Sequence, residues 1–332
     1  MTPTPSSPRR PVDPGPLARE LGLSRDQARA AWSAVRTVAH ADGAPGARST
    51  RLLDVCARAL GVSGEEAAVV DLAAAFPAPA MRRALVDALV IPACIEGEVT
   101  APRERAAARI AEELGVRSHW VELLPALRKR RVLAVKRALA TRSPDALRVF
   151  RRTWEEEGVL GVLRAIVFVL GLYRDPALAA RFHALADCPD GSFGRAVADH
   201  FRARGLTFPG EKNGMPERMV HHDLMHVLCG YDTDAAGESE LAAFYAASSG
   251  GDSFTFFVTA LATFHLGIAV SPSVVQTTRG AFDPERELAA FLRGRALRVD
   301  VMGAWNYWEL MPLPIAEARA RLGLTPANVE AN

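Results

Sequence analysis

The sequence predicts an all-α protein, on three observations. From about residue 24 onward, apolar residues recur at three- and four-residue spacing, which is the period of one face of a helix. Ala, Leu and Arg, which favour helices, dominate, and runs of β-branched residues are few. No alternating apolar and polar pattern is long enough to build a sheet. The 332 residues are enough for two domains of ordinary size.

Residues 1–23 come first, and we expect them to form a disordered tail. Met1 to Pro16 is rich in Pro and Ser and has no apolar core, and Arg9-Arg10 lacks the hydrophobic segment of a secretion signal. No charge-free apolar run is long enough to span a membrane, because Arg164 interrupts the longest one, residues 158–173. We therefore expect a soluble cytoplasmic protein, with peripheral contact at the inner membrane face left open.

Charge and cysteine content narrow the classes of partner. A net charge of +2 gives no strong field, so we expect no nucleic-acid partner. The stretch Arg128-Lys129-Arg130-Arg131 has no interleaved aromatic residue for base stacking, and we interpret it as a solvated helix face. The 4 cysteines are widely separated and form no CxxC motif, which indicates free thiols in a reducing compartment.

Residues 24–144 contain an internal repeat. Ala41-Asp42-Gly43, which leads to a closing Leu60-Gly61-Val62, corresponds to Ile95-Glu96-Gly97, which leads to Leu114-Gly115-Val116. In both copies the closing Val lies 19 positions after the first Gly, at 43 to 62 and at 97 to 116. Each copy predicts a helix, an acidic-Gly turn and a second helix that ends at Gly.

This doubled acidic-Gly turn resembles the tellurite-resistance TerB-like helical domain, over most of residues 24–144. Acidic residues near the turns are proposed cation ligands in that family, so the resemblance implies Asp42, Glu96 and Glu104 as candidates. Glu104 stands seven residues after Gly97, where the family carries a glutamate, whereas Thr50 fills that place in the first copy. The alternative is that Asp42 and Glu96 only shape turns and cap helices. The resemblance implies an interaction or regulatory module.

A second domain is predicted over residues 145–332, because Arg142-Ser143-Pro144-Asp145 reads as a boundary. It stays helical, and its expected helices and turns follow in chain order: a helix over 158–173, a helix over 181–186, a turn at 189–191, a helix over 193–204, a helix that Gly230 ends, a helix from Gly237 through Ala247, an apolar segment over 254–270 and a final helix.

The helix that Gly230 ends carries the most informative pattern in the chain. The protein has only 8 His, yet His222, Asp223 and His226 fall together and Glu238 follows after eleven residues. Each helical residue turns the chain by about 100°, so His226 lies ~40° from His222, and Asp223 lies in the same arc. Imidazole and carboxylate are ligands of Zn²⁺ and of other divalent ions. The alternative is a helix with two surface histidines beside an ordinary polar turn.

The pattern HDxxH-x11-E resembles the signature of the ubiquinone-biosynthesis COQ4 family. Weaker matches accompany it in the same order, over about residues 176–324: residues 191–196, 230–237, 293–294, 305–310, 312–313 and 319–322. The chain departs from the family in two places. Residues 218–221 stand where members tend to carry a run of Arg and Tyr, and residues 239–243 offer no lysine.

This resemblance implies a divalent, zinc-type ion held by His222, Asp223, His226 and Glu238. It further implies action on a prenylated aromatic head group or quinone precursor, by loss of the ring carboxylate coupled to hydroxylation, beside other quinone-biosynthesis proteins. A metal-dependent hydrolase is the second hypothesis. Peptidase chemistry is disfavoured because Asp223 is one methylene shorter than the catalytic Glu of an HExxH site.

A non-catalytic prenyl-lipid-binding scaffold is the third hypothesis. Phe254, Phe257 and Phe264 are candidates to line a groove for an isoprenoid tail, whose burial is worth about 0.8 kcal/mol per CH₂. The alternative is that these rings are ordinary core residues. We interpret other polar and aromatic residues as structural: His265, Asp232, Asp234, Trp305, Tyr307 and Trp308. His221 is expected to lie exposed or beside the site, and a homo-oligomer remains open.

Overall fold

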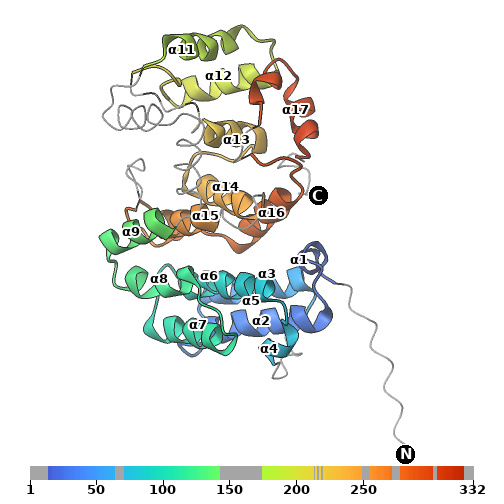
Figure 1. The fold of residues 1–332 in the computed structure, drawn as a ribbon, viewed down its shortest axis with the longest axis vertical. Helices are drawn as coiled ribbons and strands as arrows, with labels where there is room; N and C mark the ends of the chain where they lie inside the picture. The colour runs from blue at the N-terminus through green and yellow to red at the C-terminus, as the bar shows by residue number, and fades with distance from the viewer. Residues whose placement is uncertain are drawn as a thin grey trace, which may run out of the picture. The chain divides into compact units, whose positions relative to one another are not determined.

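Helices account for the regular structure of the described part of this computed structural model (Figure 1), which confirms the all-α prediction. The described residues are 14–63, 71–142, 174–212, 214, 217, 220–248, 254–270, 277–301 and 305–324. Within these ranges, β-structure is limited to isolated bridges. Contacts divide the chain into two units, Met1–Arg131 and Val132–Asn332, so the division falls earlier than the boundary near residue 144 that the sequence suggests.

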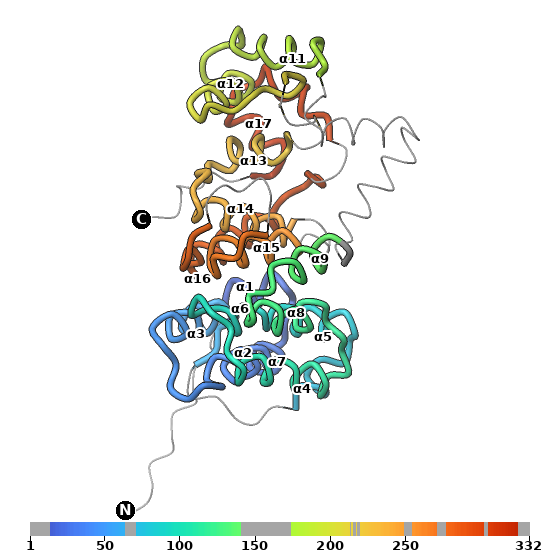
Figure 2. Tube along the Cα trace, turned by 90° about the vertical axis from the view of Figure 1, so that its left-hand side faces the viewer, coloured from blue at the N-terminus to red at the C-terminus, as the bar shows by residue number. Residues whose placement is uncertain are grey.

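The first unit packs its helices in two layers. Figures 1 and 2 show α2 and α7 side by side in one layer, with α3, α6 and α8 in the other. The helices of this unit are α1 (Pro16–Glu20), α2 (Arg25–Ala39), α3 (Ala47–Leu60), α4 (Leu72–Ala75), α5 (Pro79–Ala88), α6 (Val90–Cys94), α7 (Ala101–Glu113) and α8 (His119–Arg128).

The prediction of a disordered tail is wrong for residues 14–23, and residues 1–13 lie outside the described part. Helix α1 begins with Pro16, whose fixed φ suits the first helical position. Its Ala18 is buried in a small core with Trp32 and Leu60, and Leu17 packs against the same core. The Pro-rich composition concealed this helix because its partners lie far along the chain.

The internal repeat has the structure that the sequence predicts. In the first copy the Gly61 and Val62 amides donate to the carbonyls of Arg58 and Ala57, and Gly61 is left-handed with φ 69°. The second copy repeats both bonds, from Gly115 to Glu112 and from Val116 to Ala111, with φ 64° at Gly115. Each Leu-Gly-Val is therefore a helix C-cap in which glycine supplies the left-handed residue.

The two acidic-Gly turns each bind the other copy. Asp42 of the first copy accepts a hydrogen bond from the Thr100 hydroxyl at 2.7 Å and lies 2.8 Å from Nε of Arg103, at the start of α7. Glu96 of the second copy accepts from the Ser49 amide at 2.9 Å, at the start of α3. Ser49 and Arg103 hold equivalent places in the repeat and also meet, at 3.2 Å. These bonds hold the two copies together in the middle of the unit.

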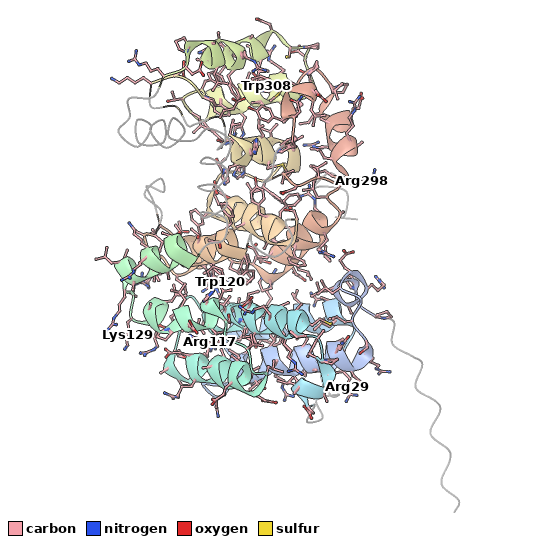
Figure 3. All side chains as sticks on the ribbon, in the orientation of Figure 1. Arg29, Arg117, Trp120, Lys129, Arg298 and Trp308 are labelled. Carbon is pink, nitrogen blue, oxygen red and sulfur yellow. The ribbon has the colours of Figure 1, made fainter. Side chains whose placement is uncertain are left out.

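The second unit places α13 between α12 on one side and α14 on the other (Figures 1 and 2). Its elements in the described ranges are α9 (Val132–Arg142), α11 (Pro176–His183), η2 (Ala184–Asp187), α12 (Phe193–Ala203), α13 (His221–Cys229), α14 (Ala235–Ser248), α15 (Phe254–Ala260), the π-helical η4 (Leu261–His265), α16 (Pro284–Arg295), η5 (Tyr307–Glu309) and α17 (Ile315–Leu322). The labelled Trp308 lies at the end of the unit that α11 and α12 form (Figure 3).

Most helix predictions for this unit are confirmed. Helix α12 covers residues 193–203, and α13 ends at Gly230, which is left-handed with φ 77°. Helix α14 begins at Ala235, two residues before the predicted start, because Asp234 accepts a hydrogen bond from the Gly237 amide and caps the helix. The helix expected over 158–173 lies outside the described residues. No described helix is both long enough and apolar enough to cross a bilayer.

Two arginines fix the C-terminal end of α13. Nη2 of Arg293, from α16, donates to the Cys229 carbonyl at 3.0 Å. The guanidinium of Arg319, from α17, donates to the carbonyls of Leu228 and Val227, at 2.7 and 3.3 Å. These carbonyls lack partners within the helix, so the arginines satisfy them and orient α13.

Candidate metal centre

Helices α13 and α14 bring three of the four predicted ligands together. One ligand atom each of His222, His226 and Glu238 lies within 4.8 Å of the others. Nε2 of His222 is 3.2 Å from Oε2 of Glu238, and Nε2 of His226 is 3.3 Å from Oε1. Both imidazoles therefore point at the same carboxylate, as two histidines one helical turn apart can do.

His226 presents a buried nitrogen to the cluster. Its side chain is fully buried, and its Nδ1 lies 3.1 Å from the Tyr231 carbonyl oxygen. A carbonyl only accepts, so Nδ1 carries a hydrogen, and Nε2 is the nitrogen left to bind a cation through its lone pair. That Nε2 is buried without a hydrogen-bond partner and faces a carboxylate. Two electron-rich atoms 3.3 Å apart are favourable only with a cation or a proton between them, so the residues present fit a divalent ion.

The other two candidate ligands, His222 and Glu238, favour opposite charges. Burial opposes protonation of His222, but the nearby Asp223 and Glu238 carboxylates outweigh it and raise the pKa of His222. The same contacts act in reverse on Glu238, where the imidazoles of His222 and His226 outweigh burial and lower the pKa to about 2. The side chain of His222 is 42% exposed, so the centre is open to solvent on this side. A small ligand can approach from there.

Asp223 lies beside the cluster and faces a different direction. Its Oδ1 is 3.9 Å from Nδ1 of His222 and 4.0 Å from Nε2 of His200 on α12. Its Oδ2 is buried and has no hydrogen-bond partner, and the same holds for Nε2 of His200. Burial is the main cause that lowers the pKa of His200, to about 4. The ligand role of Asp223 stays a prediction.

The loop from Gly230 to Gly237 determines where Glu238 lies. Asp232 accepts from the Thr233 amide and from Arg204, both at 2.8 Å, and Asp234 caps α14, so both carboxylates shape the turn as predicted. Gly237 packs so closely on Asp232 that an added Cβ would lie 2.0 Å from the Asp232 carbonyl oxygen. This close packing places Glu238 opposite α13.

An aromatic wall borders the first turn of α13. His221 is half-buried, and its ring packs against Trp305 at 5.7 Å and Tyr307 at 5.4 Å. Glu217 accepts from the Tyr307 hydroxyl at 2.7 Å and from the indole N–H of Trp308 at 2.9 Å. Tyr307 is buried, as predicted, and Trp305 and Trp308 are partly so. These aromatic contacts hold the first turn of α13 in place.

Reasoning from the sequence alone did not identify His200 or Glu217 as neighbours of this region. His200 lies on the predicted helix over 193–204, but 22 positions before His222, and no spacing rule relates the two. Glu217 stands in a stretch that the sequence marks only as a loop. Only the folded structure shows that His200 is buried and that Glu217 is partly buried beside α13.

The cation candidates of the first unit have protein partners. Asp42 is bound by Thr100 and Arg103, and Glu96 by the Ser49 amide, which lowers the pKa of Glu96 against the effect of burial. Glu104 lies 2.6 Å from Nε of Arg128. The three carboxylates form no shared cluster among the described residues. The turn-shaping and capping interpretation of Asp42 and Glu96 agrees with these bonds.

Two of the lipid-groove candidates, Phe254 and Phe257, pack against each other. Phe257 is 5% exposed, with its ring 5.3 Å from that of Phe254 and 6.0 Å from that of Phe282. Phe254 and Phe264 are half-buried. His265 is buried and accepts from the Phe282 amide at 3.2 Å, so it is a core histidine as interpreted. Lipid contact at these phenylalanines stays a prediction.

Comparison with known proteins gives little beyond this geometry. No protein-family model and no curated protein match the sequence. Among solved structures, the chain is similar to one from Nostoc punctiforme PCC 73102 described as a "putative ubiquinone biosynthesis protein". The match covers 74% of this chain and 98% of that chain, with 16% sequence identity and a TM-score of 0.32. Similarity at this level identifies neither family nor activity.

Proposed function

We propose that the second unit binds a divalent ion, of the zinc type, through His222, His226 and Glu238. The observation that carries this proposal is Nε2 of His226, which is buried without a hydrogen-bond partner 3.3 Å from a carboxylate oxygen of Glu238. Nitrogen and oxygen donors in this combination are the ligands that zinc accepts. Asp223 is the candidate fourth ligand, since it lies next to His222 with an unsatisfied oxygen.

We further propose a role in prenylquinone biosynthesis, in which the site acts on a prenylated aromatic head group. The HDxxH-x11-E pattern supports this role through its resemblance to the COQ4 family. A bound divalent ion would supply positive charge to a ring carboxylate and a phenol oxygen. The chain's residues would hold the ion on the buried side, while the exposed edge at His222 would admit the head group. Decarboxylation coupled to hydroxylation is the reaction that this resemblance implies.

Metal content tests the first proposal. His222→Ala and Glu238→Ala each remove one of three converging ligands, so we expect both variants to lose the metal that the wild-type protein retains through gel filtration. His183→Ala is a matched control, because His183 pairs with Glu211 at 2.8 Å on the surface of the same unit. Elemental analysis gives the metal per chain, and circular dichroism checks helical content. Full metal occupancy in both ligand variants would contradict the site.

Lipid content and turnover test the quinone role. We expect organic extracts of the purified protein to contain a prenylated phenol or quinone, identified by mass spectrometry. Loss of CO₂ from a prenylated hydroxybenzoate would identify an enzyme, whereas bound lipid without turnover would identify the scaffold. Phosphate release from nucleotides, with no bound lipid, would instead support a hydrolase and overturn the quinone role.

A further inference from the structure

We infer that His200 is a positioning residue, which donates its Nε2–H to the Asp223 carboxylate and thereby fixes the fourth side of the metal centre. This inference rests on the proposed function, because it assigns a role to a residue behind that same centre. His200 comes from α12, so it would link a third helix to a site that α13 and α14 form.

Geometry at His200 carries the inference. Its side chain is 7% exposed and that of Asp223 is 9% exposed, so neither group obtains full hydration. Nε2 of His200 and Oδ2 of Asp223 are both buried without a hydrogen-bond partner. Nε2 of His200 lies 4.0 Å from Oδ1 of Asp223, just beyond hydrogen-bond distance. A buried donor without a partner therefore lies 4.0 Å from a buried carboxylate, whose other oxygen also lacks a partner.

The same carboxylate also lies beside His222. Its Oδ1 lies 3.9 Å from Nδ1 of His222, whose Nε2 reaches Glu238 at 3.2 Å. His200, Asp223 and His222 thus form a series that ends at the converging ligands. The ring centroids of His200 and His226 lie 6.2 Å apart with an interplanar angle of 23°, so His200 stacks beside His226. His200 is therefore placed to act on the centre through Asp223.

Nε2 of His200 is buried without a hydrogen bond, so its proposed role depends on a bound ion. An unsatisfied buried polar group costs free energy, so a metal-free fold gains nothing from Nε2 of His200. A carboxylate that binds a metal usually receives a hydrogen bond on its other oxygen, and loss of such a partner typically weakens metal binding 10- to 100-fold. If Asp223 helps to hold the ion, His200 would supply this bond to its carboxylate.

Two variants of His200 separate this role from packing. His200→Leu removes the donor and keeps an apolar side chain, whereas His200→Gln keeps an N–H donor at a similar reach. We measure the Zn²⁺ dissociation constant by competition with a chromophoric chelator, and the thermal unfolding of the metal-free protein. We expect H200L to weaken Zn²⁺ binding about 10- to 100-fold while the metal-free protein unfolds at the wild-type temperature or above. H200Q is expected to retain most of the affinity.

A double-variant cycle tests whether His200 acts through Asp223. In a D223N background, H200L is expected to have little further effect on Zn²⁺ affinity, since the acceptor is already changed. If H200L fails to fold, His200→Met takes its place in both comparisons. Equal Zn²⁺ binding by wild type and H200L would overturn the role of His200 and leave the metal site intact. Absence of Zn²⁺ binding by the wild-type protein would instead overturn the proposed function.

Discussion

Gly237 determines the position of Glu238 because glycine, which has no side chain, allows a close approach to Asp232. The Gly237 backbone packs directly on Asp232, and a Cβ there would lie 2.0 Å from the Asp232 carbonyl oxygen and 2.7 Å from its amide nitrogen. Both contacts are with backbone atoms, so the loop has to move to make room. Because Glu238 is the next residue, any such movement displaces a candidate ligand.

We expect Gly237→Ala to weaken Zn²⁺ binding strongly and to destabilise the protein by about 1–3 kcal/mol, the usual cost of overpacking. Equilibrium dialysis against Zn²⁺ and denaturant unfolding measure the two effects. Ala236→Gly is the control, since glycine within a helix costs about 1 kcal/mol without a steric contact. Equal Zn²⁺ binding by the two variants would contradict this role of Gly237.

The candidate ligands could be predicted from sequence because their positions follow from helix geometry alone. His222 and His226 lie one turn apart on α13, and Glu238 follows a short loop that Gly230 opens. On a helical wheel, Asp223 falls in the same arc as the two histidines. Its carboxylate nevertheless lies near His200, and a helical wheel cannot show that contact. His200 itself requires knowledge of which helix packs behind α13.

At the scale of elements, α14 and α16 pack closely around a buried acid. A Cβ on Gly294 would lie 2.2 Å from the Phe244 carbonyl oxygen, so glycine permits the close approach of the two helices. Glu287 on α16 is 5% exposed, and its Oε2 has no hydrogen-bond partner. Burial raises the pKa of Glu287 to about 8, against the opposing hydrogen bond with Ser239.

This raised pKa makes stability depend on pH in a defined direction. The folded protein holds a proton on Glu287 that the unfolded chain releases near pH 4.5. The stabilising effect is therefore complete below about pH 4.5 and is lost progressively as the pH rises to about 8. We expect Glu287→Gln to gain thermal stability relative to wild type over this range, by an amount on the order of a few kcal/mol at pH 8.

Thermal unfolding of both proteins at several pH values measures this gain. Glu285→Gln, an exposed position on the same helix, is the control and should follow the wild-type curve. A constant difference between E287Q and wild type from pH 5 to pH 8 would show that Glu287 is ionised throughout.

Element boundaries were predictable where a local rule applies and not where distant contacts decide. Gly61, Gly115 and Gly230 end their helices in the left-handed conformation, as their sequence context predicts. Helix α1 was missed because Ala18 is buried by Trp32 and Leu60, which a Pro-rich segment gives no reason to expect. Local composition is a weak guide when burial comes from elsewhere in the chain.

At the scale of the whole molecule, the chain divides into two units, and the candidate metal centre lies in the second. A ligand stabilises the structure that binds it, by an amount set by its concentration and affinity. We expect Zn²⁺ to slow amide hydrogen exchange in α13 and α14, and EDTA to reverse the effect, with α2 and α7 unchanged. Hydrogen exchange followed by mass spectrometry measures each helix separately. Equal protection of α2 and α7 would contradict metal binding confined to the second unit.

Each acidic-Gly turn bonds to the other copy, so neither copy of the repeat is complete by itself. The first copy alone would leave Asp42 without its donor Thr100, and the Ser49 amide at the start of α3 without its acceptor Glu96. Both of these partners belong to the second copy. Two separate chains, each with one copy, could satisfy the same needs by pairing around a twofold axis. The repeat therefore joins in one chain the two halves that a symmetric dimer would supply, and Arg103 opposite Ser49 is a position at which the two copies differ.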